Sequence, residues 1–140
     1  MRHFLIDTNV LLDFLSDRKP FSDQAEVLFE YKHQKKIEIY VSAISFNNLY
    51  YIINKISGHK KAIKLLSELA DLVIIVSLDN SIIRNSLLNN FSDYEDAIQY
   101  NSALSVRVIE GIITRNNKDF KKSELPILSS EIAIKLADAK

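Results

Sequence analysis

The sequence predicts an α/β fold, a three-layer α/β/α sandwich with a mostly parallel sheet of four to five strands. Short apolar runs alternate with segments of helical periodicity, and this alternation is typical of a parallel sheet covered by helices on both faces. Of the 140 residues, 47% are apolar and 26% are charged, as in an ordinary globular protein. Only two glycines and two prolines occur, so we find no flexible linker and expect a single domain over residues 1–140.

Five apolar runs are expected to be strands, and helical patterns separate them. The strands are residues 3–6, 37–41, 72–76, 111–114 and 126–128. The helices are residues 9–16, 22–34, 43–56, 60–70, 79–90 and 94–106, followed by a last helix over 130–138. Ser22 follows Pro20 and Phe21 and is expected to cap the second helix.

Composition excludes several classes of site. The chain has no cysteine, which rules out disulfides and thiolate metal sites, and its three histidines lack the spacing of zinc ligands. The net charge is zero, which argues against strong nonspecific nucleic-acid binding by the whole surface. No apolar run approaches the ~18 residues that span a bilayer, and the N-terminus does not resemble a signal peptide. We expect a cytoplasmic protein that does not bind membranes.

Polar residues gather where the predicted strands end. In a parallel α/β sheet, a helix that follows a strand, or leads into the next one, begins at the carboxyl edge of the sheet, where ligands bind. Four segments place polar side chains at that edge, namely Asp7, then Ser42, Ser45 and Asn48, then Asp93 and Asp96, and finally Thr114, Asn116 and Asp119.

Carboxylates from separate segments repel one another unless a cation holds them together. Oxygen donors of this kind suit hard ions such as Mg²⁺ and Mn²⁺. A metal held by carboxylates activates water and stabilises the charge that develops on a phosphoryl group. Phosphodiester hydrolysis is therefore the reaction class that these residues favour.

Some of the acidic residues also have a structural interpretation. Ser92 and Glu95 have the spacing of a capping box, which gives both a structural role and leaves Asp93 to complement the helix dipole. Asp13 and Asp17 lie further along the first helix, and we expect them to be solvated.

At these residues the chain resembles the PIN domain family, the fold of many metal-dependent ribonucleases and of VapC-type toxins in bacterial toxin–antitoxin pairs. The opening motif is resembled by LIDTNVLLD at 5–13, and the second by VSAISFNNL at 41–49. The third is resembled by DYEDAIQYNSA at 93–103, and the fourth by ITRNNKDF at 113–120. The segment LPILS at 125–129 is similar to the last strand and helix start of the family.

The resemblance implies an endoribonuclease that hydrolyses RNA with Mg²⁺ or Mn²⁺. Its metal-binding and catalytic positions correspond to Asp7, Asp96 and Asp119, with Asp93 as an additional metal ligand. The polar residues that would orient these ligands or bound water are Asn9, Ser45, Asn48, Thr114 and Asn116, although Asn9 and Asn116 also suit turn or capping positions. Contacts to the RNA backbone are expected from Arg115, Lys118 and Lys121. A toxin of this family would bind a small antitoxin over the acidic groove and form a homodimer.

One position departs from the family pattern. The second motif usually carries a glutamate where this chain has Asn48, and an amide oxygen coordinates without bringing negative charge. Asp93, one helical turn before Asp96, is our candidate to compensate. The alternative function is a catalytically impaired PIN fold that acts by binding RNA or protein. A phosphatase or nucleotide-binding protein ranks lower, because no glycine-rich phosphate loop occurs and position 9 is asparagine where an aspartyl phosphatase has its second aspartate.

Overall fold

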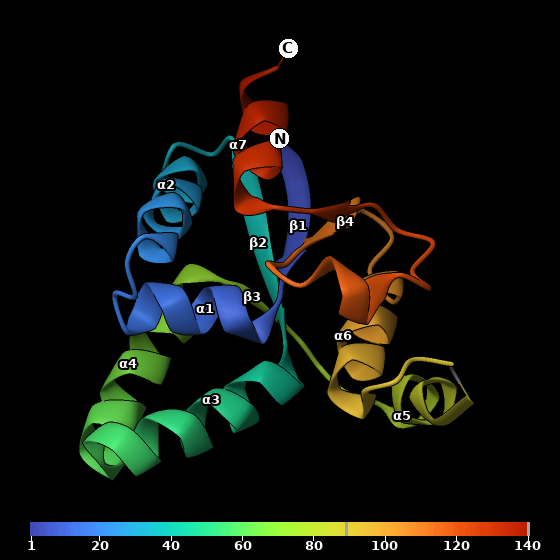
Figure 1. The fold of residues 1–140 in the computed structure, drawn as a ribbon, viewed down its shortest axis with the longest axis horizontal. Coiled ribbons are helices and arrows are strands. Elements are labelled where there is room, and N and C mark those ends of the chain that lie inside the picture. The colour runs from blue at the N-terminus through green and yellow to red at the C-terminus, as the bar shows by residue number, and fades with distance from the viewer. Residues whose placement is uncertain (89, 140) are drawn as a thin grey trace.

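Five parallel strands form one sheet in the order β3-β2-β1-β4-β5. Figure 1 shows β2, β1 and β4 of this sheet next to one another. The structure is a computed structural model that describes residues 1–88 and 90–139. The strands are β1 (Arg2–Ile6), β2 (Ile37–Ser42), β3 (Ile74–Val76), β4 (Gly111–Ile113) and β5 (Ile127–Leu128). The predicted α/β class is confirmed, and the described sheet is parallel throughout.

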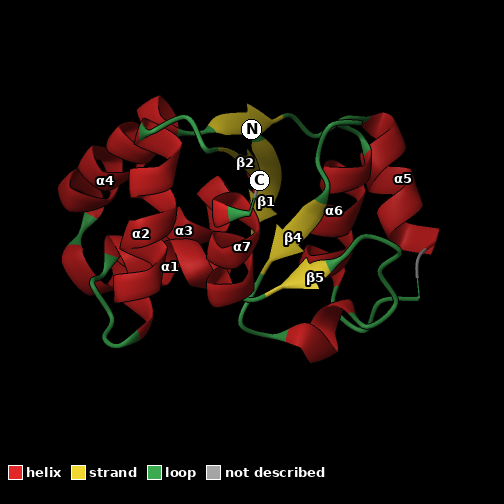
Figure 2. Ribbon diagram, turned by 90° about the horizontal axis from the view of Figure 1, so that it is seen from above, coloured by secondary structure: helices red, strands yellow, loops and turns green. Residues whose placement is uncertain are grey.

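Helices cover both faces of this sheet and give the predicted three layers. Figure 2 shows α1 to α4 and α7 on one side of the strands, with α5 and α6 on the other. Their bounds are α1 (Thr8–Leu15), α2 (Phe21–His33), α3 (Ala43–Ser57), α4 (His59–Leu72), α5 (Asn80–Leu88), α6 (Tyr94–Leu104) and α7 (Ser130–Asp138), with a short 3₁₀ helix, η1 (Asn117–Phe120).

The central strand β1 separates two apolar cores. Phe4 and Ile6 belong to the core beneath α1 to α4 and α7, whereas Leu5 belongs to the core beneath α6. Successive side chains of a strand point to opposite faces, and both faces of β1 are covered, so all three side chains are fully buried. This burial explains why residues 4–6 of β1 form an unbroken apolar run instead of an alternating pattern.

The order of the strands places a topological switch point beside β1. The chain moves from β1 outward to β2 and β3, then crosses back to β4 on the other side of β1. Leu5 is paired with Tyr40 of β2 and with Ile112 of β4. In such sheets the crevice for ligands opens at the carboxyl ends of the strands that flank the switch, which here are β1 and β4.

Predicted boundaries differ from the structure by one or two residues at most ends. Residue 72 belongs to α4, and Thr114 follows β4 instead of ending it. The helix predicted over 79–90 is α5, and residue 89 lies outside the described residues. The predicted cap at Ser22 is wrong, because α2 already begins at Phe21 and the buried Ser22 hydroxyl donates a hydrogen bond to Asp17 Oδ1 (2.9 Å).

Within residues 1–88 and 90–139, no helix combines the length and the apolar character that crossing a membrane requires.

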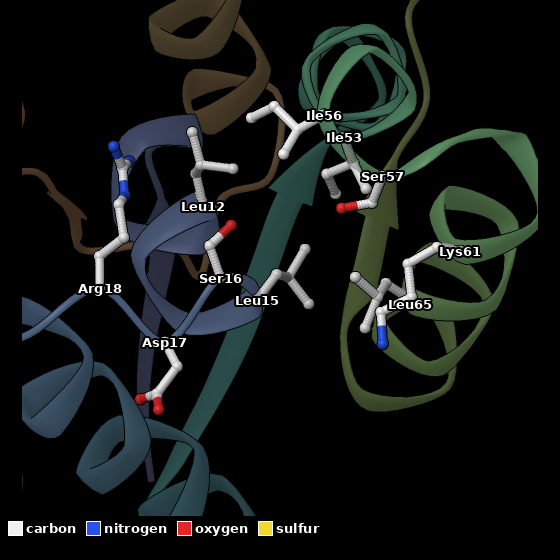
Figure 3. Close-up of a pocket in the computed structure, with 10 residues that line it drawn as sticks. All are labelled: Leu12, Leu15, Ser16, Asp17, Arg18, Ile53, Ile56, Ser57, Lys61 and Leu65. Atoms are coloured by element: carbon white, nitrogen blue, oxygen red, sulfur yellow. The ribbon is translucent and has the colours of Figure 1, made fainter.

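An apolar pocket of about 420 Å³ lies between α1 and the hairpin of α3 and α4 (Figure 3). Leu12 and Leu15 of α1 face Ile53 of α3 and Leu65 of α4 across this space. The pocket is lined by the C-terminal half of α1, whereas Asp7 immediately precedes the N-terminus of that helix. The apolar pocket is therefore separate from the acidic residues at the sheet edge.

Candidate active site

Asp7 lies at the switch point, between the end of β1 and the start of α1. Its backbone N–H donates to the Ile113 carbonyl on β4 (2.9 Å), which fixes it against the neighbouring strand. The side chain is only 3% exposed. Gln99 Nε2 donates to Oδ1 (2.9 Å) and Thr114 Oγ1 donates to Oδ2 (2.7 Å). Both carboxylate oxygens are thus held in place by buried donors.

The pKa of Asp7 reflects this environment. Burial is the largest influence and raises the pKa above its usual range, and the negative charge of Glu95 raises it further. The hydrogen bonds from Thr114 and Gln99 act in the opposite direction and favour the charged form.

Asp96 is the second buried acid of the site. It lies in the first turn of α6 and is 8% exposed. Burial raises its pKa to about 8, with further contributions from the charges of Asp93, Asp7, Asp119 and Glu95. Gln99 on α6 and Thr114 after β4 both donate to Asp7, so the third and fourth predicted segments meet the first at the carboxyl edge of the sheet, as connectivity predicted.

Asp119 joins the site from η1. The Asn116 side-chain amide donates a short hydrogen bond to Asp119 Oδ2. The Asn116 backbone N–H donates to Thr114 Oγ1 (3.0 Å), which in turn donates to Asp7. The loop after β4 thereby connects Asp119 to Asp7 through two polar side chains.

The predicted capping box at the start of α6 is wrong. The helix begins at Tyr94, so the N-cap residue is Asp93, whose Oδ1 accepts a hydrogen bond from the Asp96 backbone N–H (3.1 Å). The helix thus starts one residue later than a box formed by Ser92 and Glu95 requires. Asp93 is exposed, and one of its oxygens is engaged in the helix cap.

Glu95 points into the site. Its Oε2 accepts a hydrogen bond from Thr8 Oγ1 (2.7 Å), and Thr8 Oγ1 lies 2.7 Å from Ser45 Oγ. This contact connects α6, α1 and α3 at one point.

Gln99 and Thr8 are members of the site that the sequence analysis missed. Gln99 is fully buried, and its Oε1 accepts from the Thr8 backbone N–H (3.3 Å) while its Nε2 donates to Asp7. Glu95 and Asp96 precede Gln99 by four and three residues, so all three share one face of α6. That spacing is the signal in the sequence that places Gln99 beside the two acids.

Three other polar residues predicted for the site, Ser45, Asn9 and Asn48, differ in their burial. Ser45 is buried beside Thr8. Asn9 is exposed on α1, and Asn48 is half-buried on α3. Neither Asn9 nor Asn48 makes a side-chain hydrogen bond within the described part of the chain. The roles predicted for both remain predictions.

The prediction that Asp13 is solvated is wrong, whereas Asp17 is exposed as predicted. Asp13 is 1% exposed and accepts hydrogen bonds from Arg115, at 2.6 Å from Nε and 3.2 Å from one terminal guanidinium nitrogen. Arg18 Nε lies 3.1 Å from the same carboxylate. The Arg115 guanidinium also stacks on the Phe21 ring at 4.0 Å. A buried carboxylate requires such partners.

The three residues predicted to contact RNA lie in different surroundings. Arg115 is committed to Asp13, whereas Lys118 and Lys121 are exposed and line a pocket of about 170 Å³ together with Asp119. The two lysines therefore present positive charge beside Asp119, one of the acids of the site.

The donors gathered at this edge are all oxygen atoms. Among the described residues, no Lys, Arg or His lies within 4.0 Å of the carboxylates of Asp7, Glu95, Asp96 or Asp119. In the same part of the chain, no three acidic or histidine side chains are close enough in this conformation to complete a metal site. The chemistry of the donors fits a hard divalent cation, which would neutralise charge that the protein leaves uncompensated.

A family model described as "PIN domain" matches residues 3–118 of the chain. Comparison with curated proteins gives no match. Solved structures with the same fold include DNA-bound VapBC from Salmonella typhimurium, with 16% identity, a TM-score of 0.72 and coverage of 93% of this chain and 99% of the other. A toxin–antitoxin complex from Klebsiella pneumoniae has 23% identity, a TM-score of 0.65 and coverage of 90% and 96%. Mycobacterium tuberculosis VapC20, described as a toxin that cleaves the sarcin–ricin loop, has 11% identity, a TM-score of 0.67 and coverage of 85% and 94%.

Proposed function

The chain belongs to the PIN domain family, and from this premise we propose that it is a metal-dependent endoribonuclease that hydrolyses RNA phosphodiester bonds. The observation that carries the proposal is the pair of buried carboxylates, Asp7 and Asp96, at the switch point of the sheet. Buried acids with raised pKa values and no basic partner destabilise the folded state. A catalytic role for a bound cation accounts for their presence.

We assign Asp7, Asp96 and Asp119 as the residues that hold Mg²⁺ or Mn²⁺. When bound, the metal would supply a Lewis acid and an activated water for attack on phosphorus. Gln99 and Thr114 orient the Asp7 carboxylate through its two oxygens, and Asn116 orients Asp119. Such supporting hydrogen bonds hold ligands in the geometry that a metal requires.

The substrate and partners follow from the surroundings of the site. Lys118 and Lys121, beside Asp119, would neutralise phosphates of an RNA strand entering the acidic edge. Because two of the similar structures are toxin–antitoxin complexes, we further propose that the chain is the toxin of such a pair. On that proposal it acts in the cytoplasm, forms a homodimer and is restrained by a small antitoxin protein.

A second candidate function is a PIN fold that binds RNA or protein without cleaving. The observation that favours it is Asn48, which occupies the place of the usual glutamate and makes no side-chain hydrogen bond within residues 1–88 and 90–139. With one carboxylate fewer, the site would hold metal more weakly and activate water less.

Cleavage of a structured RNA by the purified protein, with Mg²⁺, Mn²⁺ or EDTA, separates the two functions. We expect cutting that requires metal and falls by roughly 100-fold or more in Asp7→Asn, because the variant removes a charged ligand. Asp71→Asn, an exposed acid on α4, is the matched control and should cut normally. Cutting that persists in Asp7→Asn would contradict the assigned site, and no cutting with either metal would favour the binding function.

A further inference from the structure

The second motif lacks its usual acid, and another element brings a carboxylate to the same region. The family usually has a glutamate at the position of Asn48, on α3. Ser45 lies three residues earlier on the same helix, so it marks the face of α3 that meets the site. Its hydroxyl is 2.7 Å from Thr8 Oγ1, and Thr8 Oγ1 donates to Glu95 Oε2 at 2.7 Å. A carboxylate from α6 therefore reaches the place where α1 and α3 meet.

Glu95 also lies on the face of α6 that meets Asp7. It precedes Gln99 by four residues on this helix, and the Gln99 amide donates to Asp7 Oδ1 (2.9 Å). The Thr8 hydroxyl holds one of the Glu95 oxygens. By contrast, Asp93 is exposed and its Oδ1 caps α6, so the compensation that the sequence analysis assigned to Asp93 falls better to Glu95.

We propose that Glu95 supplies the carboxylate that the family's second motif normally provides, so that α6 contributes two acidic ligands, Glu95 and Asp96, and α3 contributes none. The proposal rests on the proposed function, because it concerns the same metal site. Thr8 and Ser45 then act as positioning residues that hold the Glu95 side chain against the N-terminus of α1. On this basis Asn48 does not mark an impaired enzyme, because α6 supplies the carboxylate that α3 lacks.

The experiment measures Mn²⁺ binding directly, by calorimetry and by the electron paramagnetic resonance signal of unbound Mn²⁺, so that it does not depend on cleavage. We expect Glu95→Gln to weaken Mn²⁺ affinity by about tenfold or more, since it removes the charge and keeps the shape of the side chain. Asp71→Asn is the matched control: it removes one negative charge from an exposed acid on α4, outside the acidic edge, so affinity should change by less than about threefold.

Restoring the family glutamate provides the decisive variant. Adding Asn48→Glu to Glu95→Gln should return Mn²⁺ affinity to within about threefold of wild type, because the carboxylate count of the site is restored. Thermal unfolding without metal checks that each variant folds. Wild-type affinity in Glu95→Gln, or a double variant as weak as Glu95→Gln alone, would overturn the proposal.

Asp7→Asn distinguishes this failure from a failure of the proposed function. If Asp7→Asn abolishes Mn²⁺ binding while Glu95→Gln does not, the metal site stands and only the role of Glu95 is lost. If the wild-type protein binds no Mn²⁺, or Asp7→Asn binds it as well as wild type does, the proposed function fails and the role of Glu95 fails with it.

Discussion

At the scale of single residues, the carboxylate of Asp7 is held by two donors that differ in chemistry and origin. The Gln99 amide comes from α6 and the Thr114 hydroxyl follows β4. A buried carboxylate without hydrogen bonds is strongly destabilising, and donors that reach it favour its charged form. These two contacts therefore keep Asp7 both oriented and ionisable inside the protein.

Replacing Gln99 with leucine tests this role. The Gln99 hydrogen bond lowers the pKa of Asp7, so its loss raises that pKa further and moves the acidic limb of the cleavage pH profile to higher pH. We also expect a loss of about 1–3 kcal/mol in the free energy of unfolding, because Oδ1 loses its partner. The measurements are kcat/KM against pH and urea unfolding.

Thr114→Ser is the control for that experiment, since it keeps the hydroxyl that donates to Asp7 Oδ2. Its pH profile should match that of wild type. A Gln99→Leu profile that also matches wild type would show that the amide does not influence the ionisation of Asp7.

At the scale of elements, connectivity predicted which segments meet but not which side chains face one another. The apolar runs located β1, β2 and β4, and the polarity of a parallel sheet then brought Asp7, Asp96 and Asp119 to one edge. The start of α6 at Tyr94 was predicted correctly, but its cap was placed at Ser92 instead of Asp93. That error made Glu95 a partner of the cap instead of a side chain of the site, because a capping box pairs the N-cap residue with the residue three positions later.

The burial of Asp13 could not be predicted from its own helix. Its partner Arg115 is 102 residues away in the sequence, and periodicity along α1 carries no information about that loop. The pairing exists only because the segment after β4 returns to the side of α1, which is a property of the tertiary structure.

The Asp13 contacts connect α1 with the loop that carries Asn116 and Asp119. Replacing both Arg18 and Arg115 with alanine leaves a buried carboxylate unpaired, and we expect a loss of about 3–5 kcal/mol in the free energy of unfolding. Arg115→Ala alone should cost less, since Arg18 still pairs with Asp13. Urea unfolding of the three proteins measures both effects.

Replacing the two lysines that follow the same strand is expected to affect RNA binding and not stability. Lys118→Ala with Lys121→Ala should leave unfolding unchanged, because both side chains are exposed, and should weaken RNA binding in a salt-dependent manner. If instead the arginine variants retain wild-type stability, then Asp13 does not depend on those contacts.

At the scale of the whole molecule, zero net charge conceals an uneven distribution. There are 18 basic and 18 acidic residues, yet Asp7, Asp93, Glu95, Asp96 and Asp119 gather at one edge of the sheet. Repulsion within this group opposes folding whenever all five are ionised. Anything that neutralises the group, a proton or a cation, therefore stabilises the native state.

The raised pKa of Asp96 makes the stability of the native state depend on pH. Its pKa rises from 3.8 to about 8 on folding, chiefly through burial, so the folded protein binds this proton more tightly than the unfolded chain. The resulting stabilisation is complete below pH 3.8 and is lost as pH rises towards 8. Asp7, whose pKa is also raised, acts in the same direction.

We therefore expect the melting temperature of the metal-free protein to fall by several degrees between weakly acidic and weakly alkaline pH. Asp96→Asn, which cannot ionise, should flatten this dependence.

At alkaline pH, Mn²⁺ should restore the melting temperature of wild type, and EDTA should reverse the gain, because a ligand that binds only the native state stabilises it. The same addition should have little effect on Asp96→Asn. An equal response to pH in both proteins would mean that Asp96 is ionised at little cost in the fold, and the electrostatic argument for a cation at this edge would then lose its main support.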